Sequence, residues 1–331
     1  MSYGSVESER RLITHGVRQG SVLGPTLFNI HINGITDTCT DSEVVLYADD
    51  TEIHASAKDV SAAEKRVNKD LESTATWWNQ NGLISNHKKC KAMLIGSKHA
   101  VKNTRALQII LNGKPMKQSD YFKYLGIYLD NCLTWSKHVA YIQSRVYPKL
   151  KLLNRISSFL SRDILLRIYK QTVLPLLDYG CVVWGECSKE NAQRLERLQN
   201  QAMRIILHAD RKTCTQEMRA KLQLLSLHSR RLFIKLQYVY KIINNINCPK
   251  QLTGYLVKRS QRHCRAFRDP TLLDLPQVKT KCGQTSFKFS AASAWNKLPR
   301  EIRELTTLAQ FKGRTFTYLV NTDSVNHICT S

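Results

Sequence analysis

Apolar and polar residues alternate over residues 44–55, and a pair of acidic residues interrupts this alternation. The run VVLY ends at Tyr47, the pair Asp49 and Asp50 follows, and apolar positions return at Ile53. Alternation with a period of two is typical of strands, and a polar break between two such runs is typical of a hairpin. The sequence therefore predicts a buried strand, a tight turn that carries the two aspartates, and a return strand.

Helical periodicity flanks this hairpin on both sides. Upstream, a glycine-rich loop over residues 16–28 leads to Pro25, which suits the first turn of a helix continuing to about Ile35. Downstream, apolar residues recur every three or four positions over residues 60–78, which predicts an amphipathic helix against the sheet. The sequence Ser61 to Glu64 predicts a capping box at its start.

Shorter patterns follow this helix. A polar loop with Lys88, Lys89 and Lys91 precedes AMLIG at residues 92–96, which favours a strand. Residues 121–130 predict a strand or a hairpin in which Gly126 allows close backbone approach.

Beyond residue 130 the apolar period is helical. We expect a helix over residues 139–156 with a kink or break at Pro148, and a second helix over residues 163–174 that ends near Pro175. A third helix begins after a Ser188 cap. The segment YGCVVW at residues 179–184 is expected to pack under these helices, and residues 215–245 predict further helix.

Cationic side chains lie away from the apolar stripes of two of these helices. A phosphate backbone could bind this surface, although charged runs are more often solvated helix faces. The residues are Arg145, Lys149, Lys151 and Arg155 on the first helix and Arg194, Arg197 and Arg204 on the third, where we expect an exposed side.

The distribution of charge separates the chain into two parts. The 331 residues carry a formal net charge of +24. Residues 1–130 contain 16 Lys and Arg against 14 Asp and Glu, whereas residues 131–331 contain 34 against 12. A neutral part followed by a strongly basic one indicates a catalytic or scaffold region joined to a region that binds a polyanion. A basic surface without a partner remains the alternative.

Cysteine spacing and hydropathy exclude several classes. The 10 cysteines form no CxxC pair, so neither zinc nor a disulfide framework is expected. No apolar run reaches the length of a membrane span, and the first 16 residues lack a secretion-type apolar core. We therefore expect an intracellular protein of the nucleus or cytoplasm that is not secreted and does not contact a membrane.

Adjacent carboxylates at a hairpin tip could bind a metal ion or could simply form a polar turn. Asp49 and Asp50 have little cationic sequence around them, and hard oxygen ligands suit Mg²⁺ or Mn²⁺. Two aspartates also make an ordinary polar turn.

The ordered set of motifs resembles the later palm motifs of reverse transcriptases, and specifically those of non-LTR (LINE-type, jockey-like) retrotransposons. The resemblance covers nearly the whole chain. The matching segments are GVRQGSVLGPTLF (16–28), VVLYADDT (44–51), WWNQNGLISNHKKCKAMLIG (77–96), YFKYLGIYLD (121–130), LDYGCVVWG (177–185), LQNQAMRII (198–206) and FKFSAASAWNKLPREIRELTTLAQFK (287–312).

This resemblance implies roles for residues of the first part. Asp49 would coordinate metal directly, and Asp50 would assist coordination and place the primer. In the family, the QGS loop lines the nucleotide and template groove, with Gln19 and Gly20 nearest the substrates. The remaining residues of this set are Arg18, where the family usually has proline, Ser21 and Tyr47.

The resemblance also matches Lys89 to the lysine that protonates the pyrophosphate leaving group, although a surface lysine cluster is an equal alternative. Cys90 stands where threonine is commoner. Residues 121–130 match the primer grip, with a simple edge hairpin as the alternative. The implied partners are an RNA template, a DNA primer and deoxynucleoside triphosphates, and the implied cofactor is Mg²⁺ or Mn²⁺.

Polymerases of this family use one more carboxylate, from a strand well before the QGS loop. The 18 residues before Gln19 contain Glu7 and Glu9 in a polar context that does not match it. We therefore expect a fragment that lacks the fingers and the first catalytic aspartate, with an incomplete two-metal site and no activity alone. The open hypotheses are an RNA-directed DNA polymerase by descent, a non-catalytic nucleic-acid-binding remnant, and a chain that does not fold stably.

The predicted architecture is an α+β protein. Residues 1–130 would form a truncated reverse transcriptase palm of antiparallel strands and helices. Residues 131–250 would form a helical thumb, and residues 251–331 a basic, mostly helical C-terminal region.

Overall fold

The two aspartates lie at the tip of a β-hairpin, as the alternation predicts. In the computed structural model, which describes residues 2–3, 6–7, 16–17, 20–262 and 269–325, β3 (Glu43–Tyr47) pairs antiparallel with β4 (Asp50–His54). Tyr47 lies opposite Asp50, so Ala48 and Asp49 form a two-residue turn. Ala48 has φ of +52°, as the favoured two-residue hairpin turns require.

The expectation that the first strand is buried is wrong. Val45 and Tyr47 of β3 are 44% and 63% exposed, and residues on its other face are half-buried. The reason is that β3 and β4 form a two-stranded sheet, so described elements cover only part of its surface.

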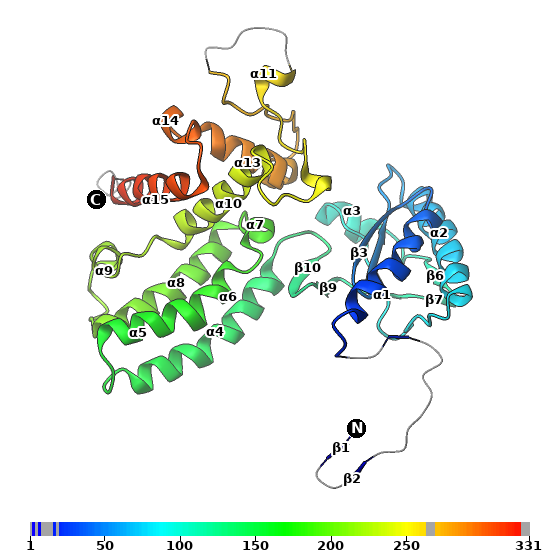
Figure 1. The fold of residues 1–331 in the computed structure, drawn as a ribbon, viewed down its shortest axis with the longest axis horizontal. Helices are drawn as coiled ribbons and strands as arrows, with labels where there is room; N and C mark the ends of the chain where they lie inside the picture. The colour runs from blue at the N-terminus through cyan, green and yellow to red at the C-terminus, as the bar shows by residue number, and fades with distance from the viewer. Residues whose placement is uncertain (1, 4–5, 8–15, 18–19, 263–268, 326–331) are drawn as a thin grey trace. The chain divides into compact units, whose positions relative to one another are not determined.

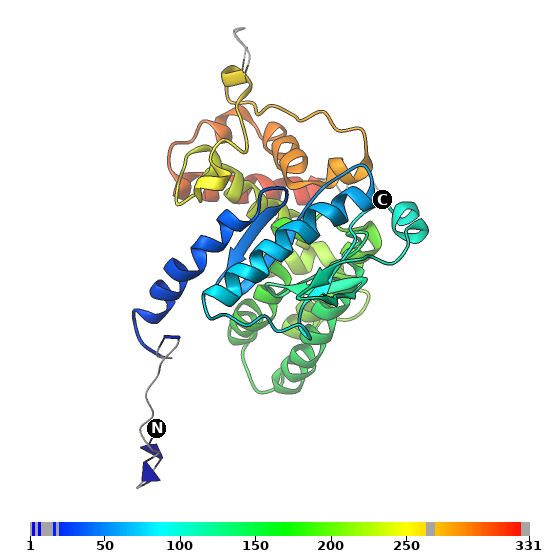
Figure 2. The same cartoon turned by 90° about the vertical axis from the view of Figure 1, so that its right-hand side faces the viewer.

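Helices surround the hairpin at its predicted flanks. α1 (Gly24–Ile32) carries Pro25 in its first turn and continues into the 3-10 helix η1 (Asn33–Thr38), so the predicted helix is confirmed with a tighter end. α2 (Val60–Gln80) packs against η1 and β4, as Figure 2 shows.

The predicted capping box of α2 is wrong. Asp59 is the N-cap, and its side chain accepts a hydrogen bond of 3.2 Å from the backbone N–H of Ala62. Because the cap lies two residues earlier than expected, Ser61 is inside the helix. Glu64 is then free to turn inward, where it accepts hydrogen bonds from Arg105 Nη2 at 2.6 Å and from the Gln108 backbone at 2.8 Å.

Short strands complete this part of the chain. They are β1 (Ser2–Tyr3), β2 (Val6–Glu7), β5 (Lys91–Ala92), β6 (Ile110–Leu111), β7 (Lys114–Pro115) and β8 (Lys117–Gln118), with helix α3 (Lys98–Asn103) between β5 and β6. The strand expected over residues 92–96 is reduced to β5, because only Lys91 and Ala92 find a partner in β8. A small core of Leu71, Ala75, Ile109 and Leu111 joins α2 to β6.

The carboxylate of Glu64 makes the stability of this core sensitive to acid. Burial by itself would raise the pKa of Glu64, but hydrogen bonds from Arg105 and Gln108, with the guanidinium charge, lower it below its ordinary value of 4.5. A carboxyl with a depressed folded-state pKa contributes stability that is complete above its unfolded-state pKa and is lost as the pH falls through the folded value.

We therefore expect Glu64→Gln to lower the free energy of unfolding at neutral pH by about 1–3 kcal/mol. Below about pH 4.5, the ordinary value, its loss of stability with falling pH should be shallower than that of the wild type. Urea unfolding at a series of pH values measures both effects. The exposed Glu72→Gln on the same helix is the control, and equal acid slopes in all three proteins would contradict the assignment.

The hairpin predicted around Gly126 is present. β9 (Tyr121–Tyr124) pairs with β10 (Ile127–Asp130), and Leu125 and Gly126 turn the chain with φ of +44° and +84°. The Tyr179 hydroxyl donates a 2.8 Å hydrogen bond to the Leu125 carbonyl. A Cβ atom at Gly126 would lie 3.1 Å from the Tyr179 ring, so the close approach expected of this glycine is observed.

The chain divides into two compact units near this hairpin (Figure 1). Met1–Phe122 and Asp130–Leu133 form one unit, and Lys123–Leu129 with Thr134–Ser331 form the other. The sheets are small and mostly antiparallel, with β5 and β8 as a parallel pair, and the second unit is largely helical, so the fold class is α+β, as predicted.

The second unit begins with helices packed around one apolar core. α4 (Ser136–Ile156) buries Val139, Ile142, Val146, Leu150 and Leu153, which is the predicted stripe, and the helix runs through Pro148 without a break. α8 (Lys189–Leu207) packs against α4 and begins at the predicted Ser188 cap, whose hydroxyl accepts a hydrogen bond from the Asn191 N–H.

The helix expected to end near Pro175 continues beyond it. α5 (Arg162–Ile168) is followed by a π-helical turn η2 (Tyr169–Val173) and by α6 (Leu174–Asp178), with Pro175 in the first turn of α6. The π turn begins a new helical segment, in which the missing N–H of a first-turn proline costs nothing. α7 (Cys181–Trp184) then buries Cys181 and Trp184 in the same core, as predicted for YGCVVW.

The C-terminal part has a second core. α9 (Thr215–Leu222) and α10 (Leu227–Ile243) divide the stretch expected as one run of helix. α10 packs on α13 (Phe287–Asn296) and α15 (Leu308–Val325), and Trp295 and Phe311 lie in this core while Phe287 packs partly buried against it. The remaining helices are η3 (Lys250–Leu252), α11 (Arg259–Arg262), α12 (Lys281–Thr285) and α14 (Arg300–Arg303).

Candidate functional site

A hollow of about 860 Å³ lies between α1, the loop before it and the hairpin strand β3. Clefts of about 300–1,000 Å³ are typical of small-molecule sites. Its lining residues include Gly20, Ser21, Phe28, Asn29, Tyr47 and Ala48. Gly20, Ser21 and Tyr47, three residues predicted from the sequence, therefore line one cavity. Ala48, the residue immediately before Asp49, also lines it.

The loop that enters this hollow is held in place by its own chemistry. Gly20 has φ of +80°, a conformation that favours glycine, and a Cβ atom there would meet nothing within 4 Å. The Ser21 hydroxyl accepts a 3.0 Å hydrogen bond from the Gly24 backbone N–H, which fixes the chain as it enters α1. Arg18 and Gln19, also expected here, lie outside the described residues.

Asp49 and Asp50 are exposed at the hairpin tip. Within the described part of the chain, no side chain forms an ion pair or hydrogen bond with either carboxylate. Their oxygens are therefore available to a hard divalent cation, and the donor type fits Mg²⁺ or Mn²⁺. Among the described residues, however, no group of three or more His, Cys, Asp or Glu side chains gathers at this or any other point.

Lys89 stands apart from the hollow. It lies exposed in the turn that follows Asn86, whose carbonyl accepts a 2.9 Å hydrogen bond from the Lys89 N–H. The structure does not include Lys89 among the residues that line the hollow. Its role therefore stays a prediction.

The cationic residues of α4 lie outside its buried stripe. Arg145, Lys151 and Arg155 are exposed, and Lys149 is half-exposed.

The expected exposed row on α8 is wrong for two of its three arginines. Arg194 donates hydrogen bonds to Gln143 Oε1 and Asn191 Oδ1, so it joins α8 to α4. Arg204 is half-buried and donates to the Arg211 carbonyl. Arg197 alone of the three is exposed, because the other two lie nearer the seam with neighbouring segments.

The sequence motifs did not identify Phe28 and Asn29, which line the hollow from α1. Both lie about one helical turn after Gly24 and Pro25, so their spacing from the glycine-rich loop was the available signal.

Comparison with known proteins gives one family match and several relatives. Residues 2–129 match the family described as reverse transcriptase (RNA-dependent DNA polymerase). The chain is 30% identical over 216 residues to the RNA-directed DNA polymerase from mobile element jockey of Drosophila melanogaster, a match that covers 62% of the chain and 23% of that relative. It is 31% identical over 209 residues to the probable RNA-directed DNA polymerase from transposon BS of the same species, covering 59% and 22%.

A longer match extends further along the chain. The jockey polymerase of Drosophila funebris is 25% identical over 264 residues, which covers 76% of the chain and 28% of the relative. The chain thus spans about a quarter of the length of these curated relatives. No solved structure matches it. None of the helices within the described ranges has both the length and the apolar character of a membrane span.

Proposed function

We propose that the chain is part of the RNA-directed DNA polymerase of a non-LTR retrotransposon, because residues 2–129 match the reverse transcriptase family. One observation carries this proposal: the hollow lined by Gly20, Ser21 and Tyr47 borders the turn that presents Asp49. The proposed substrates are an RNA template, a DNA primer and deoxynucleoside triphosphates. We propose that the protein copies the RNA of the retrotransposon in the cytoplasm or the nucleus.

The proposed division of labour follows the three regions. Residues 1–130 act as palm, residues 131–250 as thumb, and residues 251–331 as a basic region that holds nucleic acid. The concentration of positive charge after residue 130 supports this division, since the thumb and tail would contact phosphates.

In this proposal the hairpin tip holds the metal. Asp49 would coordinate a divalent cation, Asp50 would assist its coordination and position the primer end, and Tyr47 and Ala48 would shape the turn. Mg²⁺ or Mn²⁺ held there would supply activation of the primer 3′-hydroxyl and charge stabilisation at the transferred phosphoryl group. Gly20 and Ser21 would hold the incoming nucleotide and template in the hollow. Arg18 and Gln19, which precede them in the sequence, would assist, and Lys89 would protonate the leaving pyrophosphate.

A second function competes with catalysis. Asp49 and Asp50 are two carboxylates where two-metal polymerases use three, and no third acidic side chain joins them among the described residues. The chain alone would then be a non-catalytic protein that binds RNA or DNA through cationic side chains.

Primer extension tests the first function. The chain as given and its Asp49→Ala variant are incubated with an RNA template, a DNA primer and nucleotides, with Mg²⁺ or Mn²⁺. We expect no extension by the chain alone and equal RNA binding by both proteins. Extension that vanishes in Asp49→Ala would instead mean that a third ligand comes from this chain or a second copy.

Salt dependence tests the binding function. We expect RNA affinity to fall linearly with salt on logarithmic axes, and each lost phosphate contact to reduce the slope by about 0.7 for a single strand. A variant with Arg145, Lys149, Lys151 and Arg155 all replaced by alanine should have a slope lower by about 2–3. Filter binding over a salt series measures it. A variant with Arg194 and Arg204 replaced by alanine should have a lower free energy of unfolding but nearly the same salt slope of RNA binding. The reason is that these two side chains make internal hydrogen bonds.

A further inference from the structure

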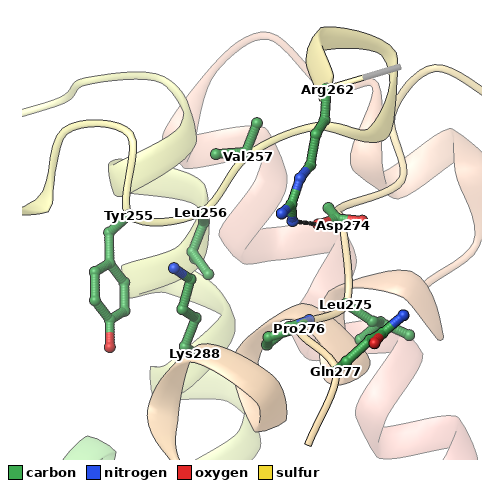
Figure 3. A pocket seen from close by; sticks show the side chains of 9 residues that line it. All are labelled: Tyr255, Leu256, Val257, Arg262, Asp274, Leu275, Pro276, Gln277 and Lys288. Atoms are coloured by element: carbon green, nitrogen blue, oxygen red, sulfur yellow. Dashed lines mark hydrogen bonds and ion pairs between the residues drawn. The ribbon is translucent and has the colours of Figure 1, made fainter.

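A second pocket, of about 470 Å³, lies in the C-terminal part of the chain, outside the match to the reverse transcriptase family (Figure 3). Its walls are residues 255–257, the segment 274–277, Arg262 of α11 and Lys288 of α13. Figure 3 shows the Arg262 side chain extending to Asp274, and the Lys288 side chain rising between Tyr255 and Pro276.

The walls of this pocket are fixed by backbone hydrogen bonds. Residues 257–259 and 272–274 form a short antiparallel bridge, with the Asp274 N–H donating to Val257 at 2.8 Å and the Arg259 N–H donating to Leu272 at 2.9 Å. The Asn296 side chain then makes two hydrogen bonds to the backbone of Leu273. Its Oδ1 accepts from the Leu273 N–H at 2.8 Å, and its Nδ2 donates to the Leu273 carbonyl at 2.9 Å. The pocket is therefore preorganised, which reduces the entropic cost of binding.

One wall is a flat aromatic ring beside a cation. Tyr255 is half-buried and stacks with Phe287 at a ring distance of 6.3 Å and an interplanar angle of 22°. The Lys288 ammonium lies 5.1 Å from the centre of the Tyr255 ring. Val257, Leu275 and Pro276 give the rest of the pocket an apolar lining.

The charges of the pocket favour an anion. Arg262 and Asp274 form an ion pair, so Lys288 remains as the exposed cation that no carboxylate among the described residues neutralises. Residues 251–331 contain 13 Lys and Arg against 5 Asp and Glu. A ligand with a flat apolar part and a phosphate matches this combination of an aromatic platform and cations.

We propose that this pocket binds one nucleotide of a single-stranded RNA or DNA, with its base on Tyr255 and its phosphate at Lys288. In the unbound protein the ammonium covers the ring, and an entering base displaces it toward the phosphate. An acidic peptide would use the cations but leave the ring without a partner, and a duplex would keep its bases stacked internally. The proposal deepens, and rests on, the nucleic-acid-binding function proposed above.

The test measures binding of fluorescent single-stranded oligonucleotides to the full chain by anisotropy, with RNA and DNA of the same sequence. We expect Tyr255→Ala to weaken binding about tenfold, and Tyr255→Phe to keep wild-type affinity because the ring remains. Lys288→Ala should reduce the salt slope by about 0.7. Lys98→Ala removes an exposed lysine of α3, outside both the pocket and the basic region, and should keep affinity within about twofold.

A strand that contains abasic sites separates base recognition from charge. The wild type should bind it about tenfold more weakly than the normal strand, whereas Tyr255→Ala should bind both alike. Ultraviolet cross-linking of a bromouridine strand should label the peptide that contains Tyr255. Because Tyr255 also packs against the second core, circular dichroism of Tyr255→Ala must match the wild type, and Lys288→Ala provides the independent readout.

The failures are distinguishable. Salt-sensitive binding that Tyr255→Ala, Lys288→Ala and abasic substitution all leave unchanged overturns the pocket and leaves the proposed function standing. Equal displacement of the strand by polyglutamate of the same charge would assign the site to acidic proteins. No binding of any oligonucleotide by the wild type overturns both proposals.

Discussion

Replacing Trp184 by alanine is expected to lower the free energy of unfolding of the helical unit by about 3–5 kcal/mol. Trp184 is fully buried, and its indole N–H donates a 2.8 Å hydrogen bond to the Tyr179 carbonyl. Its ring meets His138 edge-on at 5.3 Å and has the Arg231 guanidinium 5.9 Å from its centre. The substitution therefore removes a large apolar contact and leaves a cavity, and it also removes the donor to the Tyr179 carbonyl.

Hydrogen exchange of α4 and α8 peptides, with urea unfolding followed by circular dichroism, measures this loss. Val183→Ala is the matched control, because Val183 is the preceding residue of the same helix and is 54% exposed. It should change the free energy of unfolding by no more than about 0.5 kcal/mol. A loss below about 1 kcal/mol for Trp184→Ala would contradict the packing described here.

Apolar periodicity predicted an element well where that element packs against a single neighbouring surface. The helix over residues 139–156 was predicted from its apolar period, because a long amphipathic helix faces one core along its whole length. The β3–β4 hairpin was predicted in position but not in burial. Alternation shows that the two faces of a strand differ in polarity. The burial of the hairpin also depends on how many strands lie beside it, and residues elsewhere in the chain determine that number.

Local signals failed where two of them overlapped. Asp59 and Ser61 are both good N-caps, and the capping-box pattern favoured Ser61. With Asp59 as the N-cap, the Glu64 carboxylate binds Arg105 and Gln108 far along the chain instead of closing a capping box. The helix end predicted at Pro175 was wrong for a similar reason. A π turn before Pro175 starts a new helical segment, and no single-residue preference indicates such a turn.

The two pockets differ in how far the sequence could reveal them. The hollow beside Asp49 was partly predicted because Gly20, Ser21 and Tyr47 lie in recognisable motifs. The pocket at Tyr255 draws residues from three segments that no shared period connects. Its walls meet because Asn296 binds the backbone of Leu273, a contact that amide and backbone chemistry allows but spacing does not predict.

The Asp49 carboxylate should be the most sensitive group for catalysis. In a chimaera that joins this chain to the preceding segment of the Drosophila melanogaster jockey polymerase, we expect Asp49→Asn to slow primer extension about a thousandfold. This corresponds to about 4 kcal/mol of lost transition-state stabilisation, the scale expected for a metal ligand. Single-turnover extension with Mn²⁺ and Mg²⁺ measures the rate, and Asp50→Asn should cost about tenfold less.

Glu43→Gln is the matched control for charge. Glu43 lies on the same hairpin at its far end, opposite His54, and its side chain is 86% exposed. If Asp49 acts by holding a cation, removing the Glu43 charge should leave extension unchanged, and Mn²⁺ binding followed by electron paramagnetic resonance should weaken only in the aspartate variants. Equal losses in Glu43→Gln and Asp49→Asn would mean that the hairpin contributes general negative charge rather than a ligand. The hollow and the hairpin tip would then need separate explanations.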